Sequence, residues 1–460
     1  MSNATSTRSN RPIGVVADPI LRFAQLENAG AILLLLMTIL ALVWANSPWG
    51  DSYHHLWHTP LSFGFGDHVL SLPLEAWVND GLMAIFFFTV GLEIKREMVL
   101  GELSKLSRAM LPVMGALGGM LVPAGIYASM HMNGPAASGW GVPMATDIAF
   151  AVAALAVLGK RVPPPLKVFL LALAIADDLG AVTVIAVFYT ETIHMNALIT
   201  SFVLLGVVFG MNVLGVRAFP AYWLVGGFVW FFMHESGVHA TIAGVLLGML
   251  TPATARVEPG SGFADRVDSL VERFKEIVHL SDEEDYGGHK KAHAVDDVMT
   301  AYVNSQSPLD YLLHQLERFV AIAIMPVFAL ANAGVVFDAE VFGDAMSMQV
   351  ALAVGAGLFL GKPIGITLFA WLSVRLGFAA LPTGVNFGAL AGTGLLAGIG
   401  FTMALFVTNL AFGDAILISG SKIGIFAGSL LSAVLGVMVL QRALPAKGVL
   451  DDEDDDGHHE

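Results

Sequence analysis

The chain has 460 residues, of which 56% are hydrophobic and 13% are charged. A soluble domain carries about 25% charged residues, so the composition indicates a polytopic membrane protein. The formal net charge of −15 gives no reason to expect nucleic-acid binding, and the absence of Cys excludes disulfides, thiol catalysis and Cys-based metal sites.

The two ends of the chain are expected to be cytoplasmic segments, residues 1–26 and 442–460. Residues 1–18 are rich in Ser, Asn and Arg and lack an apolar segment ending in a small-residue cleavage site, so no cleaved signal peptide is expected. At the other end, the acidic run Asp451–Glu460 predicts a solvated, disordered tail and not a metal site.

Twelve apolar segments are predicted to cross the membrane as helices, within a transmembrane domain at 27–441. A full crossing needs about 20 mainly apolar residues, and the seventh and eighth segments are shorter than that. The segments are approximately 27–46, 76–98, 108–130, 140–159, 166–190, 195–214, 219–234, 237–252, 314–336, 347–374, 387–411 and 418–441.

Basic residues decide the orientation, because cytoplasmic loops are enriched in Lys and Arg. They gather before the first span and after every even-numbered span. The alternate loops have none, apart from Lys422 near the start of the last span. Both termini are therefore predicted to be cytoplasmic.

Two connections are unusually long. In the external connection, apolar side chains alternate with other residues on both sides of Gly66-Asp67. This pattern predicts a β-hairpin at about 61–72. The cytoplasmic loop at about 253–312 is charged. Within it, Asp265–Leu280 is either an amphipathic surface helix or part of a flexible linker.

The fourth span opens with Trp140–Asp147, where Gly and Pro interrupt a helix and Thr-Asp suits the cap of a new one. The eleventh span contains a second glycine-interrupted segment, Gly394–Thr402. Such interruptions place partial charges at the midplane, and Asp147 can offset the positive helix ends.

Each broken segment is the middle member of a three-span group, 108–190 and 347–441, and the two groups start from opposite sides of the membrane. Paired broken segments in the two halves indicate a transporter binding site. Close helix packing is the alternative role for the glycines, but it does not explain Thr146-Asp147, which adds a charge.

A pair of adjacent carboxylates, Asp177-Asp178, lies in the middle of the apolar run Leu166–Thr190. One charge at the centre of such a helix costs roughly 2.5–3.5 kcal/mol on insertion scales. The pair is either a hydrogen-bonded, permanently protonated pair that faces the helix bundle or a site that takes up and releases protons or cations within the membrane, and we favour the second.

Lys362, in the tenth span, is interpreted as the only basic residue deep within a span. It can offset the negative ends of broken helices or pair with a carboxylate. A static buried ion pair is the alternative to a proton-exchange device.

These features resemble the NhaA-type sodium/proton antiporter family over nearly all of the membrane portion. Several motifs in the right order make the resemblance more specific than any single one. They are Val78–Phe87, Gly91–Glu97, Ala145–Phe150, Ala174–Gly180, Ser236–Thr241, Phe328–Gly334, Gly361–Pro363 and Gly398–Thr402.

The resemblance implies an all-α membrane protein of twelve transmembrane helices, with inverted-topology repeats and two discontinuous helices that cross. NhaA itself is a known example of inverted repeats, so that feature follows from the family. Asp177 and Asp178 would be the exchanging carboxylates, with Asp178 the principal Na⁺ or Li⁺ ligand and Lys362 the partner of Asp177. Thr146 and Asp147 would lie at the crossing, with Thr146 a further ligand.

The family also implies regulatory positions. Glu93 and Glu97, four residues apart and so on one helical face, would line the cytoplasmic entrance and help sense pH. Asp80 would lie on the external side, and His239 matches a position that affects the pH response.

The implied setting is a bacterial inner membrane, where the chain would exchange Na⁺ or Li⁺ for H⁺. The lipid bilayer is the expected surrounding, no cofactor is expected, and the hairpin is a candidate surface for a homodimer.

One motif departs from the family. Before the ninth span, Leu313 stands at the position of an acid implicated in pH sensing, and Glu317, one turn later, is the candidate substitute. The loop at 253–312 is also longer than the family minimum. These departures concern pH regulation and not the exchange site.

Competition between Na⁺ and H⁺ for the same carboxylate oxygens yields antiport without a nucleotide, and no Walker-type phosphate loop is present. Two carboxylates permit more protons than sodium ions per cycle, so exchange is expected to be electrogenic. The rival functions are a sodium-coupled solute symporter, a cation channel, and an intramembrane aspartyl protease. The protease motif at Gly64–Asp67 falls in the external hairpin, outside any span.

Overall fold

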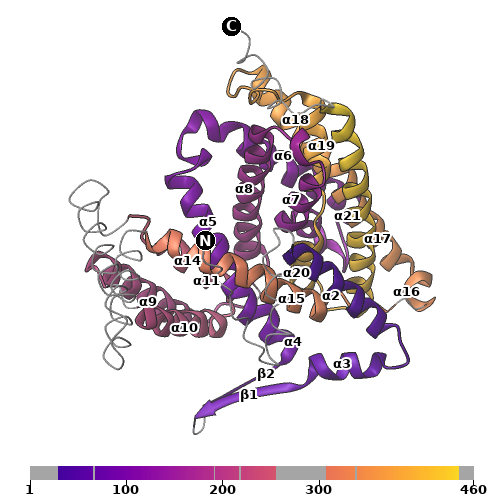
Figure 1. The fold of residues 1–460 in the computed structure, drawn as a ribbon. Helices are drawn as coiled ribbons and strands as arrows, with labels where there is room; N and C mark the ends of the chain where they lie inside the picture. Colours follow the sequence, from indigo (N-terminus) through magenta and orange to yellow (C-terminus); the bar gives the residue numbers. More distant parts are fainter. Residues whose placement is uncertain are drawn as a thin grey trace, which may run out of the picture. The chain divides into compact units, whose positions relative to one another are not determined.

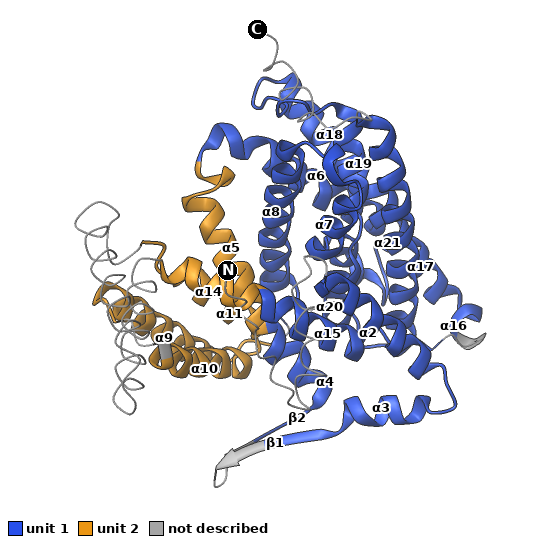
Figure 2. Ribbon diagram, in the orientation of Figure 1, with its two compact units in different colours: residues 1–83, 105–190, 318–460 blue, residues 84–104, 191–317 orange. Residues whose placement is uncertain are grey.

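Helices make up almost all of the regular structure (Figure 1) in the computed structural model, which describes residues 29–65, 68–190, 192–216, 219–254, 307–336 and 339–444. The N-terminal segment 1–26, the candidate helix Asp265–Leu280 and nearly all of the tail at 442–460 lie outside these ranges. The chain divides into two compact units, which Figure 2 colours separately. Unit 1 is residues 1–83, 105–190 and 318–460, and unit 2 is residues 84–104 and 191–317.

Unit 1 holds the longer helices and the hairpin. In chain order its elements are α2 (Ala29–Ala45), α3 (Gly50–His58), β1 (Pro60–Phe65), β2 (His68–Pro73), α4 (Leu74–Ala76), η1 (Trp77–Leu82), α6 (Leu106–Met130), η3 (Ala137–Met144), α7 (Ile148–Ala156), η4 (Gly159–Arg161), α8 (Pro164–Phe188), η5 (Val320–Ile324), α15 (Met325–Asn332), α16 (Ala339–Gly343), α17 (Ala345–Ala356), η6 (Gly357–Gly361), α18 (Lys362–Arg375), α19 (Phe387–Ala397), α20 (Phe401–Ala411) and α21 (Ala415–Ala443).

Unit 2 contains shorter helices. They are α5 (Met83–Val99), which continues from the last residue of unit 1, η2 (Glu102–Ser104), α9 (Met195–Val213), α10 (Phe219–Glu235), α11 (Thr241–Leu250) and α14 (Pro308–Phe319), whose last two residues belong to unit 1.

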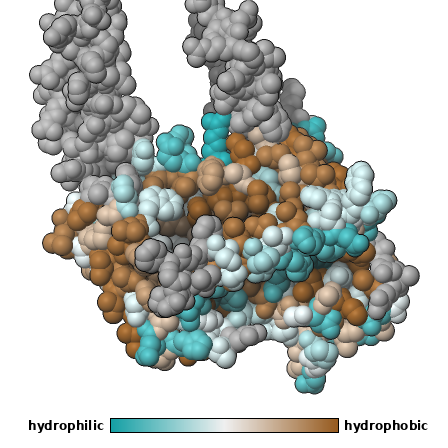
Figure 3. All heavy atoms as spheres, turned by 90° about the horizontal axis from the view of Figure 1, so that it is seen from below, coloured by the Kyte–Doolittle hydropathy of each residue, from teal (hydrophilic) through white to brown (hydrophobic). Residues whose placement is uncertain are grey.

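Among the described residues, eight helices are long and apolar enough to cross a membrane, or up to ten if each of two bent pairs forms one span. The pairs are α2 with α3, bent by 113°, and α19 with α20, bent by 49°. Each of the twelve expected segments contains helix, but α10 has 17 residues and α11 has 10. Many large apolar side chains are exposed, for example Leu36 on α2, Phe202 on α9 and Leu430 on α21. One face of the molecule accordingly carries broad hydrophobic areas (Figure 3).

The predicted hairpin is present. Strands β1 and β2 pair antiparallel, with Pro60 opposite Pro73 and Ser62 opposite Ser71. The Ser62 and Ser71 hydroxyls are 2.7 Å apart and form a cross-strand hydrogen bond. The short helix α3 before it was not predicted.

Three helix boundaries differ from the sequence prediction, each for a local reason. The eighth segment becomes helical only at Thr241, because Gly237 ends α10 in a left-handed conformation with φ +81°. Helix α14 begins at Pro308, inside the predicted loop at 253–312, because the Ser307 hydroxyl accepts a bond from the Asp310 N–H at 3.0 Å. Helix α21 begins at Ala415, because the Asp414 carboxylate caps it through the Ile416 N–H at 2.8 Å.

Helices α6 and α18 of unit 1 approach backbone to backbone. A Cβ placed on Gly118 would lie 2.1 Å from the carbonyl oxygen of Gly365, and one on Gly365 would lie 2.0 Å from that of Gly118. Only glycine at both positions permits this contact. The contact fixes the backbone of α18 three residues after Lys362.

Candidate functional site

The two broken spans of unit 1 meet at their interruptions. The segment predicted as the fourth span consists of the 3₁₀ helix η3 and the helix α7, and the segment predicted as the eleventh consists of α19 and α20. Between them, the Asp147 N–H donates to the Ile399 carbonyl at 2.6 Å. We call this meeting point the crossing.

Asp147 caps two helices at the crossing. Its Oδ1 accepts from the Phe150 N–H at 3.2 Å, at the start of α7. Its Oδ2 accepts from the Thr402 N–H at 3.1 Å and from the Thr402 hydroxyl, at the start of α20. Both helix N-termini carry partial positive charge, so one buried carboxylate offsets two helix dipoles. The sequence predicted this role for Asp147 but did not single out Thr402.

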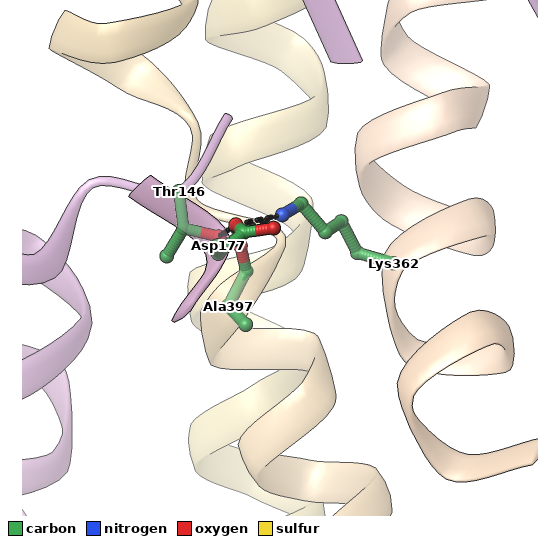
Figure 4. Close-up of polar contacts among 4 residues, drawn as sticks. All are labelled: Thr146, Asp177, Lys362 and Ala397. Carbon is green, nitrogen blue, oxygen red and sulfur yellow. Dashed lines mark hydrogen bonds and ion pairs between the residues drawn. The ribbon is translucent and has the colours of Figure 1, made fainter. Parts of the chain in front are cut away.

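Lys362 and Asp177 form a buried ion pair. Lys362, the first residue of α18, is fully buried, and Asp177 on α8 is 3% exposed. The ammonium Nζ donates to Asp177 Oδ2 and, at 2.8 Å, to the Thr146 hydroxyl oxygen. Figure 4 shows the lysine side chain extending from its helix to the carboxylate. The pairing implied by the family resemblance is therefore present.

Thr146 connects this ion pair to the broken eleventh span. Its Oγ1 lies 2.6 Å from Asp177 Oδ2 and 2.9 Å from the carbonyl oxygen of Ala397, the last residue of α19 (Figure 4). The C-terminus of a helix carries partial negative charge, and the Lys362 ammonium contacts it through Thr146. At the crossing, Asp147 thus faces the positive ends of two helices, and Lys362 faces the Asp177 carboxylate and the negative end of α19.

Asp178 follows Asp177 on α8 and is equally buried, with 3% of its surface exposed. Successive residues on a helix point about 100° apart, because a turn contains 3.6 residues. Asp178 is therefore directed differently from the carboxylate that holds Lys362. The second oxygen of Asp177, Oδ1, has no hydrogen-bond partner among the described residues.

Three of the predicted regulatory residues, Glu93, Glu97 and Glu317, belong to unit 2 and interact there. Glu317 on α14 acts electrostatically on Glu93 of α5, together with Glu97 and Arg96. Glu97 Oε2 accepts from the Glu102 N–H at 2.9 Å, and Arg96 Nε lies 3.6 Å from Asp310 Oδ1. Glu317, the candidate substitute for the missing acid, is thus close enough to act electrostatically on Glu93.

The apolar surroundings of Leu313 disfavour an acid at this position. It is 3% exposed and packs in an apolar cluster with Leu92 and Leu309, where a carboxylate would be costly. His239 lies in the connection between α10 and α11 and is half-buried, and Asp80 lies half-buried on η1 of unit 1. Neither contributes one of the contacts described at the crossing.

One interpretation of the sequence was wrong. Lys362 is not the only basic residue deep within a span, because Lys422 lies two turns inside α21 with 9% of its surface exposed. Its position near the predicted start of the span had concealed it, since that helix begins earlier than expected.

A chain of amide side chains, centred on the fully buried Asn332, was also missed. Asn332 donates to Asn79 Oδ1 at 2.8 Å, and Asn409 donates to Asn332 Oδ1. Asn79 and Asn332 lie in motifs quoted for the resemblance, but uncharged side chains gave no separate signal.

Comparison with known proteins identifies close relatives. The family model described as Na⁺/H⁺ antiporter 1 matches residues 21–440. The protein named Na(+)/H(+) antiporter NhaA from Rhodopirellula baltica is 46% identical over 440 residues, which cover 95% of this chain and 96% of that protein. The protein of the same name from Oleidesulfovibrio alaskensis is 48% identical over 433 residues, covering 94% and 95%.

A solved structure, that of the sodium proton antiporter MjNhaP1 from Methanocaldococcus jannaschii, overlaps 94% of this chain and 96% of its own chain. The TM-score is 0.48 and the sequence identity 14%. The family assignment rests on the sequence matches.

Proposed function

The chain belongs to the Na⁺/H⁺ antiporter 1 family, and from this premise we propose how its crossing performs exchange. The protein is a multi-pass membrane transporter and not an enzyme, and it exchanges Na⁺ for H⁺. The direction we propose is cytoplasmic Na⁺ outward and external H⁺ inward. The observation that carries the proposal is the buried ion pair of Asp177 and Lys362 at the crossing.

Asp178, Asp177 and Thr146 supply the oxygen atoms for the transported cation. Sodium is a hard cation and, like other hard cations, prefers carboxylate and hydroxyl oxygens. A proton and a sodium ion cannot occupy the same carboxylate oxygens, so each displaces the other. Neighbouring carboxylates titrate as a coupled system, and the proton release belongs to the pair.

The Lys362 ammonium binds Asp177 Oδ2. Exchange at Asp177 requires that the ammonium leave this oxygen, because a cation or proton bound there would compete with it. Two carboxylates that each release a proton for one sodium ion give net movement of charge, so we propose electrogenic exchange. Li⁺ has the same charge and ligand preference and is proposed as an alternative cargo.

The architecture we propose has twelve transmembrane helices in which α6–α8 and α17–α21 form two inverted three-span groups. Support comes from the two interruptions, at 145–147 and 398–400, which occupy the middle span of each group and are hydrogen-bonded to one another. We further propose cytoplasmic termini in a bacterial inner membrane, and a homodimer that contacts through the hairpin of β1 and β2.

The pH response is proposed to reside in the unit 2 cluster. The carboxylates of Glu97 and Glu317 both act electrostatically on that of Glu93, so a change at either one is felt at Glu93. Glu317 takes the part of the acid that the family usually carries where this chain has Leu313.

Sodium-induced dequenching of a pH-sensitive dye in everted membrane vesicles tests the function. Adding Na⁺ without any organic solute should release accumulated protons, with a response that varies with pH. Movement of Na⁺ without proportional proton movement would contradict exchange, and a requirement for an organic solute would favour symport.

A further inference from the structure

Five Asp, Glu, Lys or Arg side chains are buried among the described residues. Four of them, Asp147, Asp177, Asp178 and Lys362, belong to the crossing, and the fifth is Lys422 on α21. The four are at most 3% exposed, whereas Lys422 retains 9%. Burying an ammonium group without a counter-ion is costly, so its position calls for an explanation.

Lys422 lacks a close counter-ion. Within the described part of the chain, it makes no hydrogen bond and no ion pair, and the carboxylate that acts on it electrostatically is Glu75 of α4. Glu75 is half-buried and directly follows the hairpin. The pair of charges is therefore separated and not neutralised by contact.

Two groups of polar contacts link the elements η1, α15, α20 and α21, and together we call them the polar belt. It consists of Asn79 on η1, Asn332 on α15, Asn409 and Thr408 on α20, and Ser421 on α21. Asn332 is fully buried and bonds to both other amides. The Thr408 and Ser421 hydroxyls are 2.8 Å apart. Lys422 follows Ser421 directly, so the belt ends beside the lysine.

On both α20 and α21, seven positions separate the region of the polar belt from a residue that is hydrogen-bonded at the crossing. On α20, Asn409 lies seven residues after Thr402, which binds Asp147. On α21, Lys422 lies seven residues before Ser429, whose hydroxyl accepts from the Gly400 N–H at 3.2 Å. Seven residues make nearly two turns, so each pair shares a helix face and is separated by about 10 Å.

We propose that the polar belt lines the external approach to the crossing and that Lys422 opposes the binding of Na⁺ from the external side. This inference rests on the exchange and orientation proposed above, in which the connection between α20 and α21 is external. In its protonated form, the Lys422 ammonium raises the free energy of a nearby cation in a medium less polarisable than water. Lys422 thus favours release of Na⁺ outward and hinders its return.

The test compares the two faces of the membrane. The Na⁺ concentration that gives half-maximal exchange is measured in right-side-out vesicles for the external face and in everted vesicles for the cytoplasmic face. Lys422→Met should lower the external value about 10-fold, as expected for roughly one charge acting through a partly polar interior. The cytoplasmic value should change less than twofold.

Three further variants separate charge from packing. Lys422→Arg keeps the charge and should retain the wild-type external value. Glu75→Gln removes the opposing charge and should raise the external value about threefold, which also tests the inference if Lys422→Met fails to insert. Lys167→Met removes an exposed lysine of α8 and should change neither value.

Equal shifts on both faces, or no shift with either Lys422→Met or Glu75→Gln, would overturn the inference while leaving exchange intact. Behaviour of Lys422→Arg like Lys422→Met would show that shape, and not charge, matters there. Absence of Na⁺-dependent proton movement in the wild type would overturn both the inference and the proposed function.

Discussion

The Asp147 carboxylate receives both the backbone N–H and the hydroxyl of Thr402, a residue 255 positions later in the chain. The same carboxylate caps α7 through Phe150. One side chain therefore joins the start of two half-helices from different spans, and its loss should weaken both.

Asp147→Ala should lower the melting temperature more than Asp414→Ala does. Each lost helix cap costs about 0.5–2 kcal/mol, and Asp147 caps two helices whereas the exposed Asp414 caps α21 alone. Thermal unfolding of the purified variants in one detergent measures the difference. Asp147→Asn keeps an acceptor oxygen and should lose less stability. Equal effects of the two alanine variants would argue against a shared cap.

Asp178→Asn should abolish Na⁺-dependent proton movement and leave the protein folded and inserted. The amide has nearly the shape of the carboxylic acid but cannot exchange a proton. Dye dequenching in everted vesicles measures the loss, and the melting temperature checks the fold. Exchange near the wild-type level would show that Asp178 is not an exchanging carboxylate.

Lys362→Ala should lower the melting temperature as well as impair exchange. Removing one partner of a buried pair leaves the other charge uncompensated, which costs about 3–5 kcal/mol. The double variant Lys362→Ala with Asp177→Asn removes both charges and should be less destabilised than the single one. A melting temperature unchanged in Lys362→Ala would indicate that the pair is hydrated or absent in the membrane.

Changing Glu93 and Glu97 together to Gln should shift the pH profile of exchange and preserve its maximum at saturating Na⁺. The change removes two titratable groups from the unit 2 cluster and leaves Asp177 and Asp178 intact. Rates measured across a pH series report the shift, and Glu235→Gln, an exposed acid of the same unit, is the matched control. Inactivity at every pH, with correct insertion, would assign these carboxylates to transport itself.

Features that depend on local chemistry were predicted well from the sequence. The alternation around Gly66-Asp67 predicted the hairpin, and Thr146-Asp147 before an apolar run predicted a helix cap. The pair of Asp177 and Lys362 came from ordered motifs of the family, since no spacing rule links residues so far apart in the chain.

Other features depend on tertiary contacts or on side chains without charge. Lys422 was placed at a span boundary because hydropathy does not register the cap at Asp414 that starts α21 earlier. The amides of Asn332 and Asn409 are ordinary in an apolar window, and only the fold brings them together. Thr402 acquires its partner only when the two interruptions meet.

The Thr146 hydroxyl lies within hydrogen-bonding distance of two acceptors, Asp177 Oδ2 and the Ala397 carbonyl, but it carries only one hydrogen atom to donate. It can satisfy one acceptor at a time. On the exchange proposed above, uptake of a proton by Asp177 would weaken its hold on that hydrogen, and the hydroxyl could then donate to the Ala397 carbonyl at the end of α19. Proton binding at the carboxylate is thus expected to be felt, through rotation of one O–H bond, by the backbone of α19, a helix far away in the sequence.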